Sequence, residues 1–233
     1  MPLCLRVGHE LLGGPTCWPR RVRHLIHHTS ALPPIDDTYP GSGNEGVLES
    51  LRKSAGPSRQ PGTAYAYSNV GYVCLAEILT RISDQPVATL ARSELFTPLD
   101  MAASTLSSGL GLNRAGHEPP PTTIGDGGLW TTAEDLHRWN VAMNTAAFGH
   151  TVHHRAETPG TLDDGTRLDY AWGVRVIDHQ GRRTLSHGGS WPTWSAKTVR
   201  QPDQGTSVAI LTASEDTQAV TAVALDTATT LTR

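Results

Sequence analysis

Lysine and cysteine are both scarce in this chain. Its 233 residues include only two lysines, Lys53 and Lys197, beside seventeen arginines, and only three cysteines. Three cysteines without regular spacing argue against a disulfide framework and against a zinc site. Cys74 lies in an apolar stretch, so we expect it to be a small buried residue. Because lysines are so few, every position at which a catalytic lysine could stand can be checked.

Long apolar runs and blocks of charge are missing as well. The longest apolar runs are far too short to span a bilayer, so we expect no membrane span. The net charge is -3 and basic residues form no stripe, which argues against nucleic acid as a partner. The first twenty residues contain no apolar segment ending in a small-residue cleavage site, so the chain as written carries no secretory signal. Its localisation therefore stays open.

The chain changes character along its length. Apolar spacing and capping residues predict helices over 22–26, 45–54, 70–82 and 87–96, and from Thr131 or Thr132 to about 143, with loops at 33–44 and 106–124. From Tyr170 onward, alternating segments at hairpin spacing predict strands, and residues 215–231 predict a closing helix. Helices first and antiparallel strands afterwards indicate an α+β fold rather than βαβ units.

The expected domain organisation follows from this order. Residues 1–20 show neither helical nor strand periodicity and are interpreted as an irregular leader. Residues 21–233 are expected to form a single domain, with a mainly helical part over 21–150 and an antiparallel sheet with its closing helix over 165–233. A chain of this length is able to bury a sizeable core.

Two short motifs are the candidates for chemistry. Tyr67-Ser68-Asn69 follows Pro-Gly and precedes an apolar helix, and His187-Gly188-Gly189 lies among the strands. Each also has a purely structural interpretation. Ser68 or Asn69 can serve as the N-cap of the helix, and His187 can be an ordinary hairpin histidine. His27-His28 offers no identifiable third ligand, so we expect no metal site there.

Several stretches together resemble one family. They are VRHLIHHTSAL, PGTAYAYSNVGYVCLAEIL, GDGGLWTTAEDLHRW, DYAWGVRV and LSHGGSWPTWSAKTVRQPDQGTSVAIL. This set is similar to the serine β-lactamase-related family, of the class C β-lactamase, D-alanyl-D-alanine carboxypeptidase and esterase type. The resemblance implies a β-lactamase/transpeptidase-like fold, with a helical subdomain and an antiparallel sheet flanked by helices. It also implies acyl-enzyme hydrolysis of a β-lactam, D-alanyl peptide or ester, without a cofactor.

The resemblance assigns roles to individual residues. A serine hydroxyl needs a positioned base to attack a carbonyl, and Tyr67 is that base by resemblance. Its phenol, with a reference pKa of about 10, needs a neighbouring cation to act near neutrality. Asn69 would donate a hydrogen bond to the substrate amide or position the catalytic lysine that follows the serine in the family. His187 takes the place of a different family lysine, the first residue of a Lys-Thr-Gly motif.

Three further residues would bind substrate. Gly188 and Gly189 would let an extended substrate lie against the strand without side-chain obstruction. The backbone N–H of Ser190 would then donate to the oxyanion. Ala31 and Thr193 stand where the family usually has glycine. Both replacements are expected to strain the local backbone geometry.

The nucleophile motif Ser-x-x-Lys is not found at its usual place. Lys197 has Trp194 three residues before it and therefore fails. Ser50 and Lys53 fit the spacing, but they lie in a polar helix end only seventeen residues before Tyr67. We therefore expect the fold to be N-terminally incomplete, with an unprotected sheet edge, and the chain to be inactive.

Two alternatives to that expectation stay open. The chain can be a non-catalytic module that binds peptidoglycan-like peptides or a partner protein with the remnant groove between Tyr67 and His187. The other alternative is a rearranged fold in which Ser50 is the nucleophile.

Overall fold

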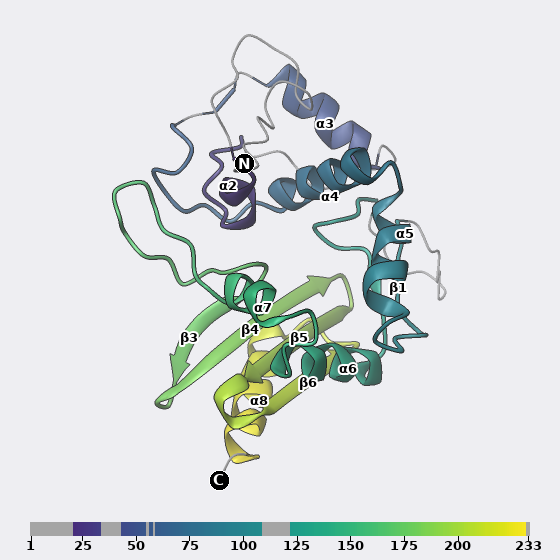
Figure 1. The fold of residues 1–233 in the computed structure, drawn as a ribbon, viewed down its shortest axis with the longest axis vertical. Coiled ribbons are helices and arrows are strands. Elements are labelled where there is room, and N and C mark those ends of the chain that lie inside the picture. The colour runs from purple at the N-terminus through teal and green to yellow at the C-terminus, as the bar shows by residue number, and fades with distance from the viewer. Residues whose placement is uncertain (1–20, 34–42, 55, 58, 109–121, 232–233) are drawn as a thin grey trace.

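The computed structural model describes residues 21–33, 43–54, 56–57, 59–108 and 122–231 (Figure 1). The expected leader over 1–20 lies outside the described residues, as do the central parts of the two loops expected at 33–44 and 106–124. Within the described part, no helix is long and apolar enough to cross a membrane.

The first part of the chain is helical. Its elements are α2 (Val22–Ile26), α3 (Gly43–Lys53), α4 (Asn69–Ser83), α5 (Val87–Ala91), the π-helix η1 (Arg92–Phe96), α6 (Ala133–Asn144) and α7 (His150–Ala156). Helices α2, α3 and α4 enclose a shared core in which Leu25, Leu48 and Val73 are almost fully buried. Cys74 belongs to the same core, as expected. Figure 1 shows these three helices grouped at one end of the molecule, above the sheet.

Local signals explain where the helices begin and end. Helix α4 ends at Ser83. Its C-cap residue Asp84 adopts a left-handed conformation with φ 55°, and Pro86 follows shortly after. Helix α6 begins after Thr132, whose side chain accepts a hydrogen bond from the backbone N–H of Asp135 at 3.2 Å. The predicted N-cap of α6 is thus confirmed at Thr132.

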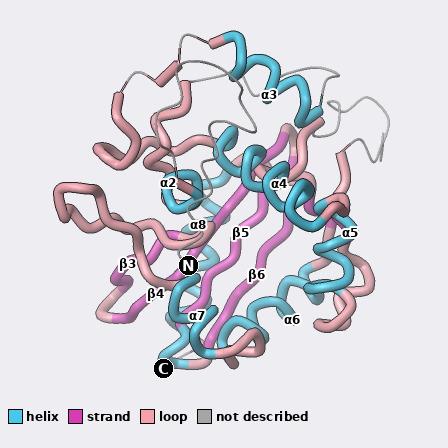
Figure 2. The backbone as a smooth tube through the Cα atoms, turned by 45° about the horizontal axis from the view of Figure 1, so that its top comes forward, coloured by secondary structure: helices cyan, strands magenta, loops and turns pink. Residues whose placement is uncertain are grey.

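The second part is an antiparallel sheet of four strands. In spatial order they are β3 (Arg175–His179), β4 (Arg182–Trp191), β5 (Trp194–Gln201) and β6 (Thr206–Thr212). The short 3₁₀-helix η2 (Pro202–Gln204) connects β5 to β6, and α8 (Thr217–Thr230) closes the chain. Figure 2 shows the strands running side by side between the helices. The expected α+β architecture with an antiparallel sheet is confirmed.

Helices cover both faces of the sheet. Helix α8 packs Ala224 and Ala228 against Val199 of β5 on one face. On the other face, the buried Arg200 of β5 pairs with Glu157 at the end of α7, with nitrogen and oxygen 2.9 Å apart. Since side chains alternate along a strand, Val199 and Arg200 mark the two opposite faces.

Some expectations about the elements were wrong in detail. The helix expected over 87–96 is divided into α5 and η1, and α7 had not been expected. The strand expected from Tyr170 begins only at Arg175. Two short strands, β1 (Thr105–Leu106) and β2 (Leu129–Trp130), pair with each other outside the main sheet.

Among the described residues, the sheet is open along part of β4 and along the outer sides of its two terminal strands, β3 and β6. Strand β3 pairs with β4 only from Arg182 to Ser186, so among the described residues the segment His187–Trp191 has no strand on that side. Strand β6 likewise has a described partner only in β5. The first of these edges carries the candidate site.

Candidate active site

The first motif lies at the start of α4. Tyr67 precedes the helix and is 52% exposed. Ser68 is the N-cap residue, with an extended backbone at φ -150° and ψ 113°, and Asn69 is the first residue of α4. The Ser68 hydroxyl makes no capping bond, but its backbone N–H donates to Nδ1 of His28 at 3.1 Å. The motif is therefore fixed to the α2 region through His28.

His28 is a central part of this site that the sequence motifs did not indicate. Its imidazole is 1% exposed and is surrounded by tyrosine rings. The ring centroids of Tyr67, Tyr170 and Tyr72 lie 4.2, 4.6 and 5.2 Å from that of His28. Burial lowers the pKa of His28 to about 4, and the nearby charge of His187 adds to the effect. His28 is therefore neutral at ordinary pH.

Tyr170 connects the two motifs and was also missed by motif reasoning. Its ring centroid is 6.2 Å from that of Tyr67 and 6.4 Å from that of His187. The side chain is 2% exposed, and burial raises its pKa above that of an ordinary tyrosine. Its backbone carbonyl accepts a hydrogen bond from Nδ1 of His27 at 3.0 Å. The only signal in the sequence was the family-like stretch DYAWGVRV, which gives no role to any one residue.

The tyrosine hydroxyls at the base of this cluster are held in their protonated form. The hydroxyl of Tyr72 donates to the carbonyl of Ile26 at 3.0 Å, and burial raises the pKa of Tyr72 to about 12. Tyr65 lies at the rim, where its hydroxyl accepts a long hydrogen bond of 3.4 Å from Arg175. Among these rings Tyr67 is the one with more than half of its surface open.

The second motif forms the open edge of β4. His187 is partly buried, whereas Gly188, Gly189 and Ser190 are exposed. A Cβ on Gly189 would meet no atom within 4 Å. A Cβ on Gly188 would lie 3.1 Å from the carbonyl oxygen of Ala196. The two expected substrate-binding glycines therefore differ, since only Gly188 is needed for close packing inside the sheet.

Positive charge gathers beside this edge. Burial lowers the pKa of His187, and the charges of Lys197 and Arg175 lower it further. Burial and the charge of Arg175 also lower the pKa of Lys197. Arg175 is paired with the carboxylate of Asp169. The site thus combines a cationic side near β4 with an aromatic side around His28.

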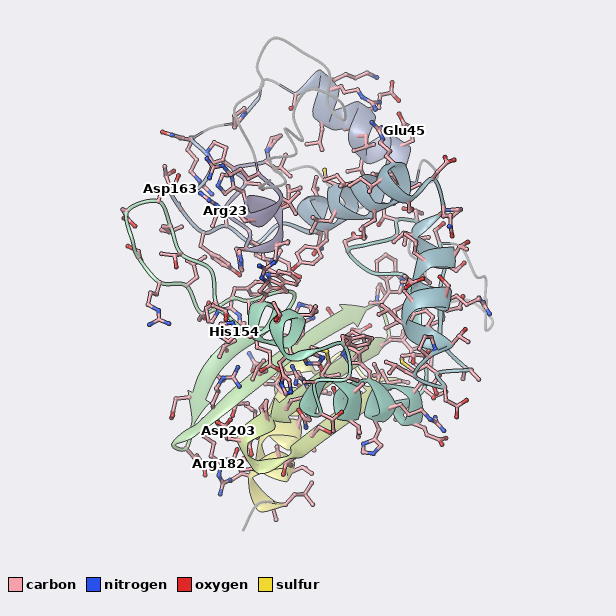
Figure 3. All side chains as sticks on the ribbon, viewed as in Figure 1. Arg23, Glu45, His154, Asp163, Arg182 and Asp203 are labelled. Carbon is pink, nitrogen blue, oxygen red and sulfur yellow. The ribbon has the colours of Figure 1, made fainter. Side chains whose placement is uncertain are left out.

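The loop before Tyr170 is tied to the helical part by charge. Arg23 of α2 and Asp163 form an ion pair at 3.1 Å, and Figure 3 shows the two side chains close together. Both side chains are about half exposed, so this pair contributes at most about 1 kcal/mol to stability. It orients the loop that leads to Tyr170 more than it stabilises the fold.

The alternative nucleophile pair lies in a different place. Ser50 and Lys53 belong to α3, which Figures 1 and 2 show on the outer side of α4, away from the sheet. The ammonium of Lys53 pairs with Glu49 at 2.7 Å, and its side chain is 73% exposed. This lysine is therefore held by a neighbour on its own helix. The structure brings Tyr67, Asn69 and His187 to one region but does not bring Lys53 there.

The chain is similar to known proteins in sequence. The family model described as Beta-lactamase matches residues 16–229. Penicillin-binding protein 4* of Bacillus subtilis (strain 168) is 25% identical over 232 residues, which cover 84% of this chain and 51% of that protein. A D-aminopeptidase of Gluconobacter oxydans (strain 621H) is 25% identical over 214 residues, covering 81% of this chain and 40% of its own length. The chain spans about half the length, or less, of these relatives.

The fold is similar to solved structures as well. A D-stereospecific amidohydrolase from Streptomyces sp. superposes with a TM-score of 0.75 at 18% sequence identity, covering 96% of this chain and 79% of that one. The penicillin-binding protein from Bacillus halodurans gives a TM-score of 0.73 at 18% identity over 90% of this chain and 72% of its own. At such identities the likeness concerns the fold alone.

Proposed function

The chain belongs to the beta-lactamase family and has the β-lactamase/transpeptidase-like α+β fold, and from this premise we propose that it carries the substrate-binding side of a serine-hydrolase site. The ligands are β-lactams, D-alanyl peptides or small esters. They bind between Tyr67 and the open edge of β4. In this chain the site binds these ligands but does not form an acyl-enzyme with them.

The single observation that carries the proposal is the convergence of the two motifs on Tyr170. Tyr67 and His187 come from segments 120 residues apart in the sequence, and their rings both lie within 6.4 Å of the Tyr170 ring. An ordinary helix entry and an ordinary hairpin would have no reason to meet around one buried tyrosine. The arrangement supports a shared site for the two motifs.

Each expected site residue has a role in the proposal. Tyr67 and Asn69 face the reacting carbonyl from the helical side, and His187 faces it from the sheet. The exposed backbone of Gly188 and Gly189 pairs with an extended ligand, as strand edges do. The N–H of Ser190 donates to the carbonyl oxygen of the ligand. Substrate-binding geometry of this kind does not require a nucleophile.

We expect no catalytic turnover because neither of the two lysines is placed to activate a serine nucleophile. Acylation requires a serine whose proton is removed by a positioned base. Lys197 has no serine three residues before it. Lys53 follows Ser50 by three residues, but both lie on α3, on the outer side of α4, and Lys53 is paired with Glu49. Removal of an activated serine leaves only binding and oxyanion effects, with a loss of several orders of magnitude in rate.

Hydrolysis assays test the absence of turnover. The purified chain is mixed with a chromogenic cephalosporin and with a nitrophenyl ester, and initial rates are compared with buffer. We expect rates near the uncatalysed background. Turnover at an ordinary enzymatic rate, of roughly 1 per second or more, would show that the chain contains a working nucleophile.

A second candidate function is a non-catalytic binding module for peptidoglycan-like peptides or a partner protein. The open edge of β4 favours it, because an edge strand can bind an extended peptide without any catalytic group. Titration with acetyl-D-alanyl-D-alanine, followed by tryptophan fluorescence, tests the ligand site that both proposals share. Saturable binding that weakens in His187→Ala supports a ligand site at this edge, and no binding to any ligand class rejects both proposals.

The Ser50 alternative has its own direct test. A fluorophosphonate probe or a penicillin would add its mass to a serine nucleophile, and intact-mass spectrometry detects that adduct. We expect no adduct. An adduct that disappears in Ser50→Ala would restore Ser50 as the nucleophile, whereas Ser54→Ala serves as a control on a neighbouring serine.

A further inference from the structure

A cavity of about 380 Å³ lies between α2 and the loop that leads to Tyr170. This volume falls within the range of small-molecule sites. Charged, imidazole and hydroxyl groups line it together with one apolar side chain. The lining includes Arg23, His27, Thr29, Thr161, Leu162 and Asp163. Neither Tyr67 nor any residue of β4 contributes to the wall, so this cavity is distinct from the proposed ligand site.

Hydrogen bonds between the two sides of the cavity fix its shape. Nδ1 of His27 and the backbone N–H of Gly160 donate to the same carbonyl, that of Tyr170, at 3.0 and 2.9 Å. The backbone N–H of Asp163 donates to the carbonyl of Gly62 at 3.0 Å. A Cβ on Gly160 would lie 2.5 Å from Cγ of His27, so the loop backbone packs directly against the imidazole. The walls are therefore preorganised for a ligand.

His27 contributes a hydrogen-bond acceptor to this cavity. A carbonyl oxygen only accepts, so the bond to Tyr170 requires that Nδ1 carry the proton. Burial lowers the pKa of His27, and the ring is therefore neutral near pH 7. In a neutral ring with a protonated Nδ1, the other nitrogen, Nε2, has a free lone pair. A ligand group that meets Nε2 must donate a hydrogen bond.

Arg23 and Asp163 bring opposite charges to the same cavity. Nη2 of Arg23 lies 3.1 Å from Oδ1 of Asp163, and both side chains are about half exposed (Figure 3). A guanidinium group has five N–H donors and a carboxylate has two accepting oxygens, so one contact leaves both with bonding capacity. An exposed pair of this kind contributes little to stability and rearranges at small cost. The cavity thus offers one cationic and one anionic partner.

We propose that this cavity binds a small zwitterion of the α-amino acid class. The ammonium group of the ligand donates to the carboxylate of Asp163 and to Nε2 of His27. Its carboxylate accepts from the guanidinium of Arg23, and its side chain contacts Leu162. The inference goes beyond the proposed function and does not rest on it.

Ligands with a single charge match the same lining less well. An anion meets Arg23, but it is repelled by the carboxylate of Asp163 and faces a second acceptor at His27. A cation meets Asp163 and is repelled by Arg23. Like charges placed together suppress wrong partners, whereas a zwitterion pairs each charge with its opposite. Charge-assisted hydrogen bonds of this type are about twice as strong as neutral ones.

Calorimetric titration of the full chain at pH 7 tests the inference with three probes. Glycine carries both charges, glycinamide carries only the ammonium group, and acetate carries only the carboxylate. We expect glycine to bind saturably and about tenfold more tightly than either of the others, as the loss of one charged hydrogen bond predicts.

Variants locate the binding. Asp163→Asn should weaken glycine about tenfold and remove its advantage over acetate, and Arg23→Gln should remove its advantage over glycinamide. Glu45→Gln is the matched control, because Glu45 pairs with Arg52 on the surface of α3, away from the cavity. It should bind glycine as the wild type does. Thr161→Phe, at an exposed loop position, fills the cavity without removing either charge and should abolish binding.

Three results would overturn the inference. Without saturable binding of glycine, the cavity is a hollow for water alone. If acetate or glycinamide binds as tightly as glycine, the ligand class is wrong. If acetyl-D-alanyl-D-alanine displaces glycine while Asp163→Asn and Thr161→Phe leave its affinity unchanged, glycine occupies the site at Tyr67 and not this cavity. Urea midpoints of the variants confirm that each is folded, and Thr161→Phe decides the matter where a charge variant is not.

Discussion

The imidazole of His28 packs against the ring of Tyr67 in a tilted arrangement, with centroids 4.2 Å apart and planes inclined by 37°. The same imidazole accepts the backbone N–H of Ser68 through Nδ1. His28 thus holds both the side chain and the backbone of the Tyr67-Ser68-Asn69 motif. Since Nδ1 is an acceptor only in the neutral ring, protonation of His28 would break this arrangement.

The first prediction is that His28 makes stability depend on pH. Its pKa is about 4 in the folded protein and 6.5 in an ordinary histidine, so the unfolded chain binds more protons between these values. The free energy of unfolding therefore falls as the pH falls below 6.5, and the loss from His28 is about 2 kcal/mol between pH 7.5 and pH 5. Urea unfolding at both pH values measures it.

His27 and His187 also have lowered pKa values and contribute in the same pH range. The His28 share is obtained from His28→Asn, which should lose about 2 kcal/mol less than the wild type between the two pH values. His154→Asn, at an exposed position, should behave as the wild type. An identical pH dependence in His28→Asn and in the wild type would contradict the assignment.

The second prediction concerns Thr193, at the tip of the hairpin between β4 and β5. Pro192 and Thr193 form the two-residue connection, and Thr193 has φ 70°. Proline followed by a residue with positive φ is typical of a type II turn, whose third position favours glycine. A β-branched residue is strained there. The hydroxyl of Thr193 is also buried without a hydrogen-bond partner among the described residues.

Thr193→Gly should raise the free energy of unfolding by about 1 kcal/mol, because relief of the left-handed strain exceeds the added backbone entropy. Ala31 also has a positive φ, of 53°, but its methyl group is buried, so Ala31→Gly should gain less. Thr198→Gly, within β5, should be destabilising. Denaturant midpoints compare the three, and a loss of stability in Thr193→Gly would count against strain at the turn.

Much of the fold was predictable because its signals are local. The apolar spacing of 70–82 gave α4 to within one residue at each end, and Thr132 marked the start of α6. Helix α7 was missed because HTVHHRA has little apolar periodicity. The end of α7 is held by the buried ion pair between Glu157 and Arg200, two residues that are 43 positions apart in the sequence. The division of 87–96 into α5 and a π-helix is likewise set by packing, which the periodicity of a sequence does not show.

The site was predictable only in part, for a similar physical reason. Tyr67 and His187 stand in recognisable motifs, and the roles expected for them stay predictions. His28 and Tyr170 act through ring contacts across the fold, which no local pattern marks. Lys197 was excluded from the Ser-x-x-Lys motif because Trp194 stands three residues before it. Its position over Gly188 depends on strand register, which became visible only in the sheet.

The third prediction concerns the outer edge of the sheet. Strand β6 has no described partner on its outer side, and Leu211 on this strand is 38% exposed. Long apolar edge strands template association between chains, and lysine on an edge is a common protection. We expect the protein to associate with increasing concentration, and Leu211→Lys to shift it toward monomer in sedimentation velocity. Val223→Lys, an exposed apolar position on α8, should have no such effect. A wild type that stays monomeric over the whole concentration range would refute an exposed adhesive edge.

The fourth prediction separates the two glycines of the second motif. A Cβ at 188 would lie 3.1 Å from the carbonyl oxygen of Ala196 and 3.2 Å from Cδ of Lys197, whereas a Cβ at 189 meets nothing within 4 Å. Gly188→Ala should therefore lower the free energy of unfolding by about 1 kcal/mol, a typical cost of overpacking. It should also displace Lys197. Gly189→Ala should unfold at the wild-type denaturant midpoint or slightly above it, because alanine loses less backbone entropy than glycine in a strand.

Urea unfolding of Gly188→Ala, Gly189→Ala and the wild type under the same conditions makes this comparison. The larger loss should fall on Gly188→Ala, because its added methyl group meets the backbone of β5 and the side chain of Lys197. Equal stability of the two variants would show that the sheet adjusts at 188.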